Sequence, residues 1–169
     1  MPRTVRLGRI LWILAGVFGI TPASALAADD LAVERLATCQ DSWLDWQKNA
    51  PEQLASFGDH FRSAFRRSGN DPYFVPKTQS AIAGFRVLRA MPDSVGMGVG
   101  FSVVVAASFD DAKQTLEHKL RRTLGKCESG DGMRACELEI GEMRTLMVMA
   151  EDSSKSAETL IGCYYLYEK

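Results

Sequence analysis

Four cysteines constrain this chain more than any other feature of its sequence, because their pairing decides which distant segments must meet. They are Cys39, Cys127, Cys136 and Cys163, and all four follow the N-terminal leader described below. An even number of cysteines in an exported chain predicts two disulfides, and three connectivities are open.

The residues between Cys127 and Cys136 indicate which cysteines pair. They include the run Ser-Gly-Asp-Gly at 129–132, which is turn-forming, so a local loop can bring the two thiols together. We therefore predict a Cys127–Cys136 disulfide and a Cys39–Cys163 disulfide. A metal site is the alternative use of the thiols, but the chain has no Cys-x-x-Cys spacing and two histidines. We expect no metal and no cofactor.

The N-terminus has the order of regions that a secretory signal needs. Arg3, Arg6 and Arg9 precede an uncharged, mostly apolar run at 10–20, and small residues at 21–27 follow. This pattern predicts a signal peptide over 1–27, cleaved after Ala27 or alternatively after Ala25, and a single globular domain over 28–169. The apolar run of about 11 residues is shorter than the roughly 20 that span a bilayer, so we expect no stable membrane anchor after cleavage. The predicted location is the bacterial periplasm, with secretion as the alternative.

Charge argues against nucleic acid as a partner. Removal of the leader leaves 17 basic and 21 acidic residues, a net charge of about −4. Affinity for nucleic acid comes mainly from basic side chains that neutralise phosphates, and this sequence has no basic stripe with interleaved aromatic residues.

Helical periodicity is clear in three segments. Apolar residues recur every three or four positions over 29–50, with Cys39 in the middle, and Pro51 interrupts the pattern. A second helix is expected from Leu54 to about Arg67, ending at the turn residues 68–72. A third is expected over 108–124, with Ser108 as N-cap and Gly125 as C-cap.

Alternating patterns predict five strands, at 81–91, 95–107, 134–140, 142–150 and 158–167. The resulting order is two helices, two strands, one helix and three strands. This order predicts an α+β fold, in which an antiparallel sheet of about five strands carries helices packed on one face and two disulfides.

One predicted strand has a face without side chains. Gly96, Gly98 and Gly100 share it, and their spacing matches neither common phosphate-binding loop. Glycines on one strand face let a backbone or an aromatic ring come close. We expect a helix of the same molecule there, through Trp43 or Trp46, and a ligand or partner protein is the alternative.

Two further groups are candidates for partner binding. Tyr165 and Tyr167 share a strand face with Cys163, where they either pack in the core or form an interface. Arg62 and Arg66 belong to the second predicted helix, where they either are solvated or dock an acidic partner.

Catalytic signals are weak. His60 and His118 each adjoin an acid, but neighbours on a helix point about 100° apart and no nucleophile motif accompanies them. Glu137 and Glu139 are expected on a solvated strand face. We therefore assign no catalytic residue.

Together these observations favour a non-catalytic periplasmic domain that binds another exported protein, such as an inhibitor or immunity protein against an exported toxin or hydrolase. A carrier of a small apolar ligand is the first alternative. An enzyme with an unrecognised site is the second, since a site assembled from distant residues leaves no local motif.

Overall fold

The computed structural model describes residues 28–65, 72–92, 99–141, 143–152 and 157–165. These contain four helices, α1 (Ala28–Ala37), α2 (Trp43–Asn49), α3 (Pro51–His60) and α4 (Phe109–Leu120). They also contain nine strands, which are β1 (Phe61–Phe65), β2 (Pro72–Pro76), β3 (Ala81–Ile82), β4 (Phe85–Pro92), β5 (Val99–Ala106), β6 (Gly125–Gly130), β7 (Met133–Gly141), β8 (Arg144–Glu151) and β9 (Glu158–Tyr165). The predicted signal peptide at 1–27 lies outside the described residues.

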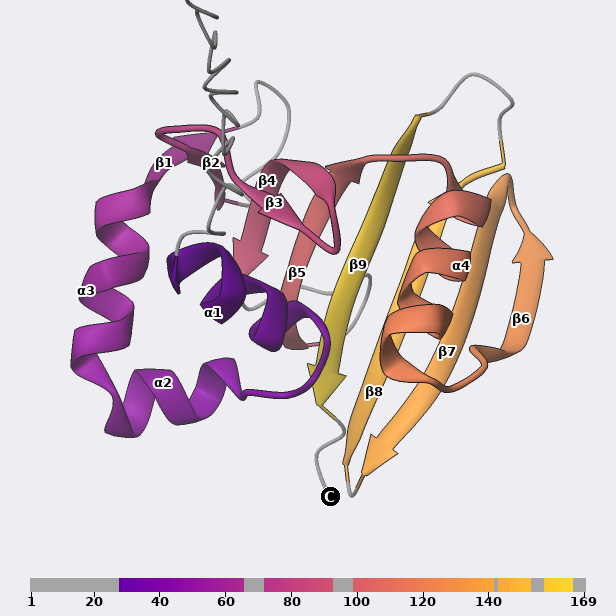
Figure 1. Ribbon diagram of the computed structural model, residues 1–169, viewed down its shortest axis with the longest axis horizontal. Helices are drawn as coiled ribbons and strands as arrows, with labels where there is room; N and C mark the ends of the chain where they lie inside the picture. Colours follow the sequence, from indigo (N-terminus) through magenta and orange to yellow (C-terminus); the bar gives the residue numbers. More distant parts are fainter. Residues whose placement is uncertain (1–27, 66–71, 93–98, 142, 153–156, 166–169) are drawn as a thin grey trace, which may run out of the picture.

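The strands form one antiparallel sheet in the order β1-β2-β4-β5-β9-β8-β7-β6, and β3 pairs with β4 outside this path. Its centre is the pair β5 and β9, which are joined over eight residue pairs from Val99–Tyr165 to Ala106–Glu158. Figure 1 shows α1 and α4 in front of the sheet, with α2 and α3 toward its β1 end. The last described strand therefore lies at the middle of the sheet, between β5, which precedes α4 in the chain, and β8, which follows it.

The prediction of an α+β sheet of about five strands in the order α-α-β-β-α-β-β-β was wrong. The described residues are mostly antiparallel strand, and the sheet has nine strands. The second predicted helix is one cause, because α3 ends at His60 and residues 61–65 continue as β1. Phe57, Phe61 and Phe65 fit helical spacing, but pairing with β2 decides the conformation of the last two.

Strand β6 was missed for a different reason. All six of its residues are exposed, and it begins and ends with glycine, so no alternation of apolar residues marks it. Two external constraints hold it: pairing with β7 and the Cys127–Cys136 disulfide.

The first predicted helix is two helices. α1 ends at Ala37, and Cys39 adopts a left-handed backbone conformation with φ of 62° before α2 begins at Trp43. Apolar periodicity runs through this break because both helices bury the same stripe, including Leu36, Trp43 and Trp46. The turn presents Cys39 to Cys163 on β9, its disulfide partner.

The third helix was predicted correctly at its N-terminus and incorrectly at its C-terminus. The Ser108 hydroxyl accepts a hydrogen bond from the Asp111 backbone N–H at 3.2 Å, which is the expected capping contact. The C-cap is Arg121, with φ of 53°, and Gly125 begins β6 instead.

The core forms between the helices and the sheet. Aromatic rings dominate its α2–α3 end: the Trp43 ring centroid lies 5.4 Å from those of Phe57 and Phe101, and Phe57 stacks on Phe61 at 4.6 Å. Burial of side chains this large contributes roughly 1.5–3 kcal/mol each.

A buried carboxylate connects α1 to two other elements. Glu34 is 4% exposed; its side chain accepts a hydrogen bond from the Ala83 backbone N–H at 2.7 Å and forms an ion pair with Lys119 on α4. These contacts fix the position of α1 over the sheet.

Candidate functional site

An open pocket of about 350 Å³ lies where strands β2 and β4 diverge. Within the described residues, the two strands pair at Phe74 and Ala90 alone. Next to that pair, Val75 of β2 pairs with Arg62 of β1. At the start of β4, Arg86 pairs instead with Ala81 of β3. β4 also carries an irregularity between Val87 and Arg89. The divergence leaves space between the strands, and this space is the pocket.

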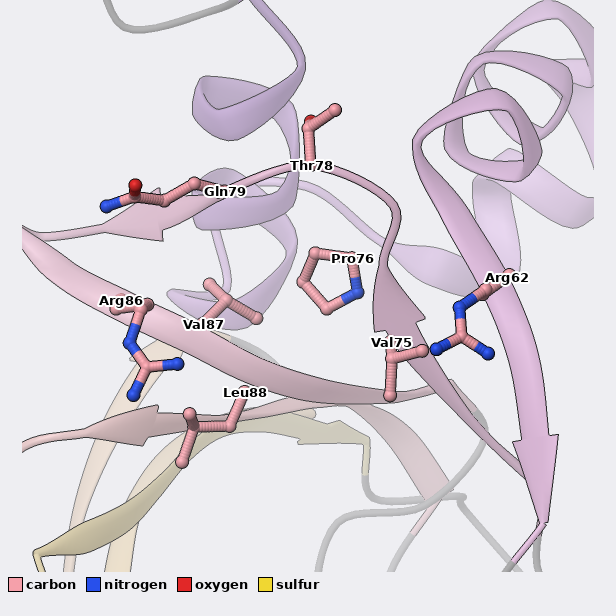
Figure 2. A pocket seen from close by; sticks show the side chains of 8 residues that line it. All are labelled: Arg62, Val75, Pro76, Thr78, Gln79, Arg86, Val87 and Leu88. Carbon is pink, nitrogen blue, oxygen red and sulfur yellow. The ribbon is translucent and has the colours of Figure 1, made fainter.

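Two arginines lie on opposite sides of this pocket. Figure 2 shows Arg62 extending from β1 and Arg86 from β4, with Val75 and Pro76 between them. Both arginines are exposed. Within the part of the chain that the structure describes, neither guanidinium has a hydrogen-bond or ion-pair partner. The pocket therefore contains two positive charges that can bind an external anion.

The rim and floor of the pocket define what else a bound group would meet. Thr78 and Gln79 lie on the loop after β2 and supply a hydroxyl and an amide, and both are exposed. Val75, Pro76, Val87 and Leu88 supply apolar surface. No carboxylate is among the residues that line the described pocket, so its charge is uncompensated.

This arrangement suits carboxylate recognition. A guanidinium offers parallel N–H donors in a fork that matches the two oxygens of a carboxylate, and such charge-assisted pairs are among the stronger hydrogen bonds. Two of them on facing walls, with amide and hydroxyl groups at the rim, favour a group or segment with more than one negative charge.

The partner-binding residues predicted from sequence do not converge on one place. Arg62 lines the pocket, whereas Gly100 and Tyr165 lie on the central strands β5 and β9. Gly96, Gly98, Tyr167 and Arg66 lie outside the described residues. The expectation that Arg62 belongs to a helix was wrong, because it lies on β1.

Gly100 serves the packing of the sheet. A Cβ atom at this position would lie 1.9 Å from the carbonyl oxygen of Cys163 and 2.9 Å from the Tyr164 Cα. The group that approaches Gly100 is thus the backbone of the neighbouring strand β9, where we had expected a helix.

Tyr165 belongs to the core. It is 9% exposed, and its hydroxyl accepts a hydrogen bond from the Trp43 N–H at 2.9 Å. Burial raises the pKa of its phenol above the usual 10.0, and the Trp43 N–H partly offsets this by stabilising the phenolate. Of the two readings of this tyrosine, core packing agrees with its position.

The predicted disulfides are both present with the predicted pairing, Cys39–Cys163 and Cys127–Cys136. The first bridge is buried at both ends. In the second, Cys127 is exposed and Cys136 is buried.

The histidines lie in separate places. His60 is on α3, where its Nδ1–H donates to the Ser56 carbonyl at 2.8 Å, and His118 is exposed on α4. In the described ranges, no three histidine, cysteine or acidic side chains gather as metal ligands would. Also within those ranges, no helix is both long enough and apolar enough to cross a membrane.

Sequence reasoning missed Arg86, Thr78 and Gln79. Arg86 alternates with Phe85 and Val87 in a predicted strand, which marks it as solvent-facing but not as a neighbour of Arg62, 24 positions earlier. The one available signal was the short polar segment at 77–80. It lies between a segment bounded by two prolines and an apolar stretch, and this position indicates a surface loop.

Comparison with known proteins adds no relative: no protein-family model, no curated protein and no solved structure matches this chain.

Proposed function

We propose that this protein is an exported, non-catalytic binding domain that recognises an acidic segment of another exported protein, as an inhibitor or immunity protein against an exported toxin or hydrolase does. The pocket between β2 and β4, which we call the two-arginine pocket, is the proposed contact surface. It comprises Arg62, Arg86, Thr78, Gln79 and the apolar residues beneath them.

The observation that carries the proposal is the uncompensated charge of the two-arginine pocket. Exposed arginines commonly pair with a carboxylate of the same chain, as Arg134 does with Asp110 at 3.0 Å and Arg35 with Asp41 at 2.9 Å. Arg62 and Arg86 have no such partner within the described residues. Because the mature chain is acidic overall, a local positive pocket also directs an acidic partner to one place on its surface.

Compartment and crosslinking are consistent with this role. Two disulfides are compatible with a protein that works outside the cytoplasm, where they persist. A sheet crosslinked to the helical segment presents β1, β2 and β4 with little reorganisation on binding, which lowers the entropic cost of association.

The test pairs affinity capture with charge variants. Residues 28–169 are immobilised and exposed to periplasmic extract, and the retained proteins are identified by mass spectrometry. Arg62→Gln/Arg86→Gln removes the proposed contacts, and Lys48→Gln/Arg122→Gln removes the same charge from exposed sites outside the pocket. We expect one protein that the wild type and the control variant retain and the pocket variant loses.

A direct titration addresses the chemistry of the pocket without a known partner. A hexaglutamate peptide is added to ¹⁵N-labelled protein while amide and arginine Nε–H signals are followed by NMR. We expect shifts at Arg62, Gln79 and Arg86 that weaken as salt is raised, because exposed charge pairs are screened. Shifts spread over all basic residues would contradict the proposal, and so would a captured protein that the pocket variant retains as well as the wild type does.

A further inference from the structure

A second cavity, of about 150 Å³, lies between α1, α3 and β1, and we call it the aromatic cavity. Its walls are largely apolar, with Val33 from α1, Trp46 from α2, Phe57 from α3 and Phe61 from β1. All four of these side chains are buried. The aromatic cavity has no lining residue in common with the two-arginine pocket, so an inference about it is independent of the proposed function.

The aromatic cavity adjoins the surface. A more open pocket of about 350 Å³ shares Ala32, Trp46 and Gln53 with it and continues past Leu31 and Arg35. Leu31 is 53% exposed, one of the few large apolar side chains with such exposure in the described residues. A small molecule can therefore reach the cavity from solvent along α1.

One residue that lines the cavity carries a buried polar atom without a partner in the described part of the chain. The side-chain oxygen of Gln53 is buried, and within the described part of the chain it accepts no hydrogen bond. Leaving a buried acceptor unsatisfied costs free energy, which a donor in the cavity would recover once the Gln53 amide turns toward it. His60, which also lines the cavity, already uses its Nδ1–H on the Ser56 carbonyl.

Size and chemistry together define the class of ligand. An apolar cavity of this volume holds a molecule about as large as benzene. Aromatic walls favour an aromatic ring, which can pack edge-on or offset against Trp46 and Phe57. The buried Gln53 oxygen favours a single N–H or O–H donor on that ring.

We propose that the aromatic cavity binds a small aromatic molecule with one hydrogen-bond donor, of the phenol type, whose ring packs against Trp46, Phe57 and Phe61 and whose donor pairs with Gln53. Toluene is the matched probe without a donor, because its methyl group replaces the phenol hydroxyl at nearly the same size. Hydrophobic burial alone would favour toluene, so a preference for phenol requires a polar contact.

The experiment is a pair of NMR titrations of the mature protein with phenol and with toluene, following the Trp46 indole N–H and the Val33 methyl groups. We expect phenol to bind about tenfold more tightly than toluene, the usual size of one hydrogen bond. Gln53→Leu should reverse this order, and Gln114→Leu, an exposed glutamine on α4, should leave it unchanged.

A second variant distinguishes binding inside the cavity from binding at the surface. Ala32→Leu places three further carbon atoms at the cavity wall and should abolish binding of both probes, while circular dichroism checks that the fold persists. Absence of shifts at Trp46 and Val33 in the wild type would overturn the proposal. So would a wild type that prefers toluene, or a phenol preference that persists in Gln53→Leu.

Discussion

The phenolic oxygen of Tyr165 accepts a hydrogen bond from the backbone N–H of Trp43 at 2.9 Å, across a sequence separation of 122 residues. Trp43 is the first residue of α2, so this N–H has no acceptor within its own helix. Both residues are buried. The last described strand thus supplies a cap for α2, one of the first elements of the described residues, beside the Cys39–Cys163 disulfide.

Replacement of this tyrosine tests the contact. Tyr165→Phe keeps the ring but leaves the Trp43 N–H buried without an acceptor, so we expect a loss of about 1–2 kcal/mol in the free energy of unfolding. Urea denaturation of the protein comprising residues 28–169 measures it. Tyr73→Phe on β2 is the matched control and should change the free energy by less than about 0.5 kcal/mol. Equal effects of the two variants would mean that the hydrogen bond does not stabilise the fold.

The same tyrosine should make the free energy of unfolding depend on pH in the alkaline range. Burial raises the pKa of Tyr165 in the folded state, so above the unfolded value of 10.0 the unfolded chain releases a proton that the folded chain retains. The contribution to stability is therefore fully present below pH 10 and is lost as pH rises through the folded pKa. Burial raises the pKa of Tyr164 as well, in the same direction.

Denaturation at a series of pH values from 8 to 11 measures this dependence. The free energy of unfolding should fall above pH 10, and Tyr165→Phe should make the decline shallower. A decline of the same slope in the variant would show that other groups are responsible.

Gly100 should be intolerant of any side chain. A Cβ there would lie 1.9 Å from the Cys163 carbonyl oxygen, so Gly100→Ala must separate β5 from β9 at the centre of the sheet. We expect a loss of about 3 kcal/mol or more in the free energy of unfolding. Gly58→Ala is the control: a Cβ on this glycine of α3 meets no atom within 4 Å, and it should gain about 0.5–1 kcal/mol from helix propensity. Thermal or urea denaturation distinguishes these opposite signs.

The two disulfides should differ in how much they stabilise the fold and in how accessible they are to a reductant. The chain-entropy model gives about 5 kcal/mol for the bridge with a sequence separation of 124 and about 2.5–3 kcal/mol for the bridge with a separation of 9. Cys39→Ala/Cys163→Ala should therefore destabilise the fold more than Cys127→Ala/Cys136→Ala. In native buffer, dithiothreitol should reduce Cys127–Cys136 first because Cys127 is exposed. Alkylation followed by mass spectrometry identifies the order, and prior reduction of the buried bridge would contradict this account.

The sequence alone determined the local features whose signals are short-range. The turn residues between Cys127 and Cys136 indicated the local disulfide, and with four cysteines the long bridge followed from it. Ser108 and the apolar stripe after it specified the start of α4. Each of these depends on residues within a few turns of one another, where spacing and propensity are sufficient.

The tertiary structure decided the elements whose conformation depends on distant partners. Phe61 and Phe65 match a helix in spacing, yet pairing with β2 places them on a strand. The exposed strand β6 exists because β7 and a disulfide hold it. Arg62 and Arg86 form one pocket because β2 and β4 diverge, and Gln53 lines a cavity because α1, α2, α3 and β1 meet there. Strand pairing and cavity formation join residues far apart in the chain, so no local pattern of residues specifies them.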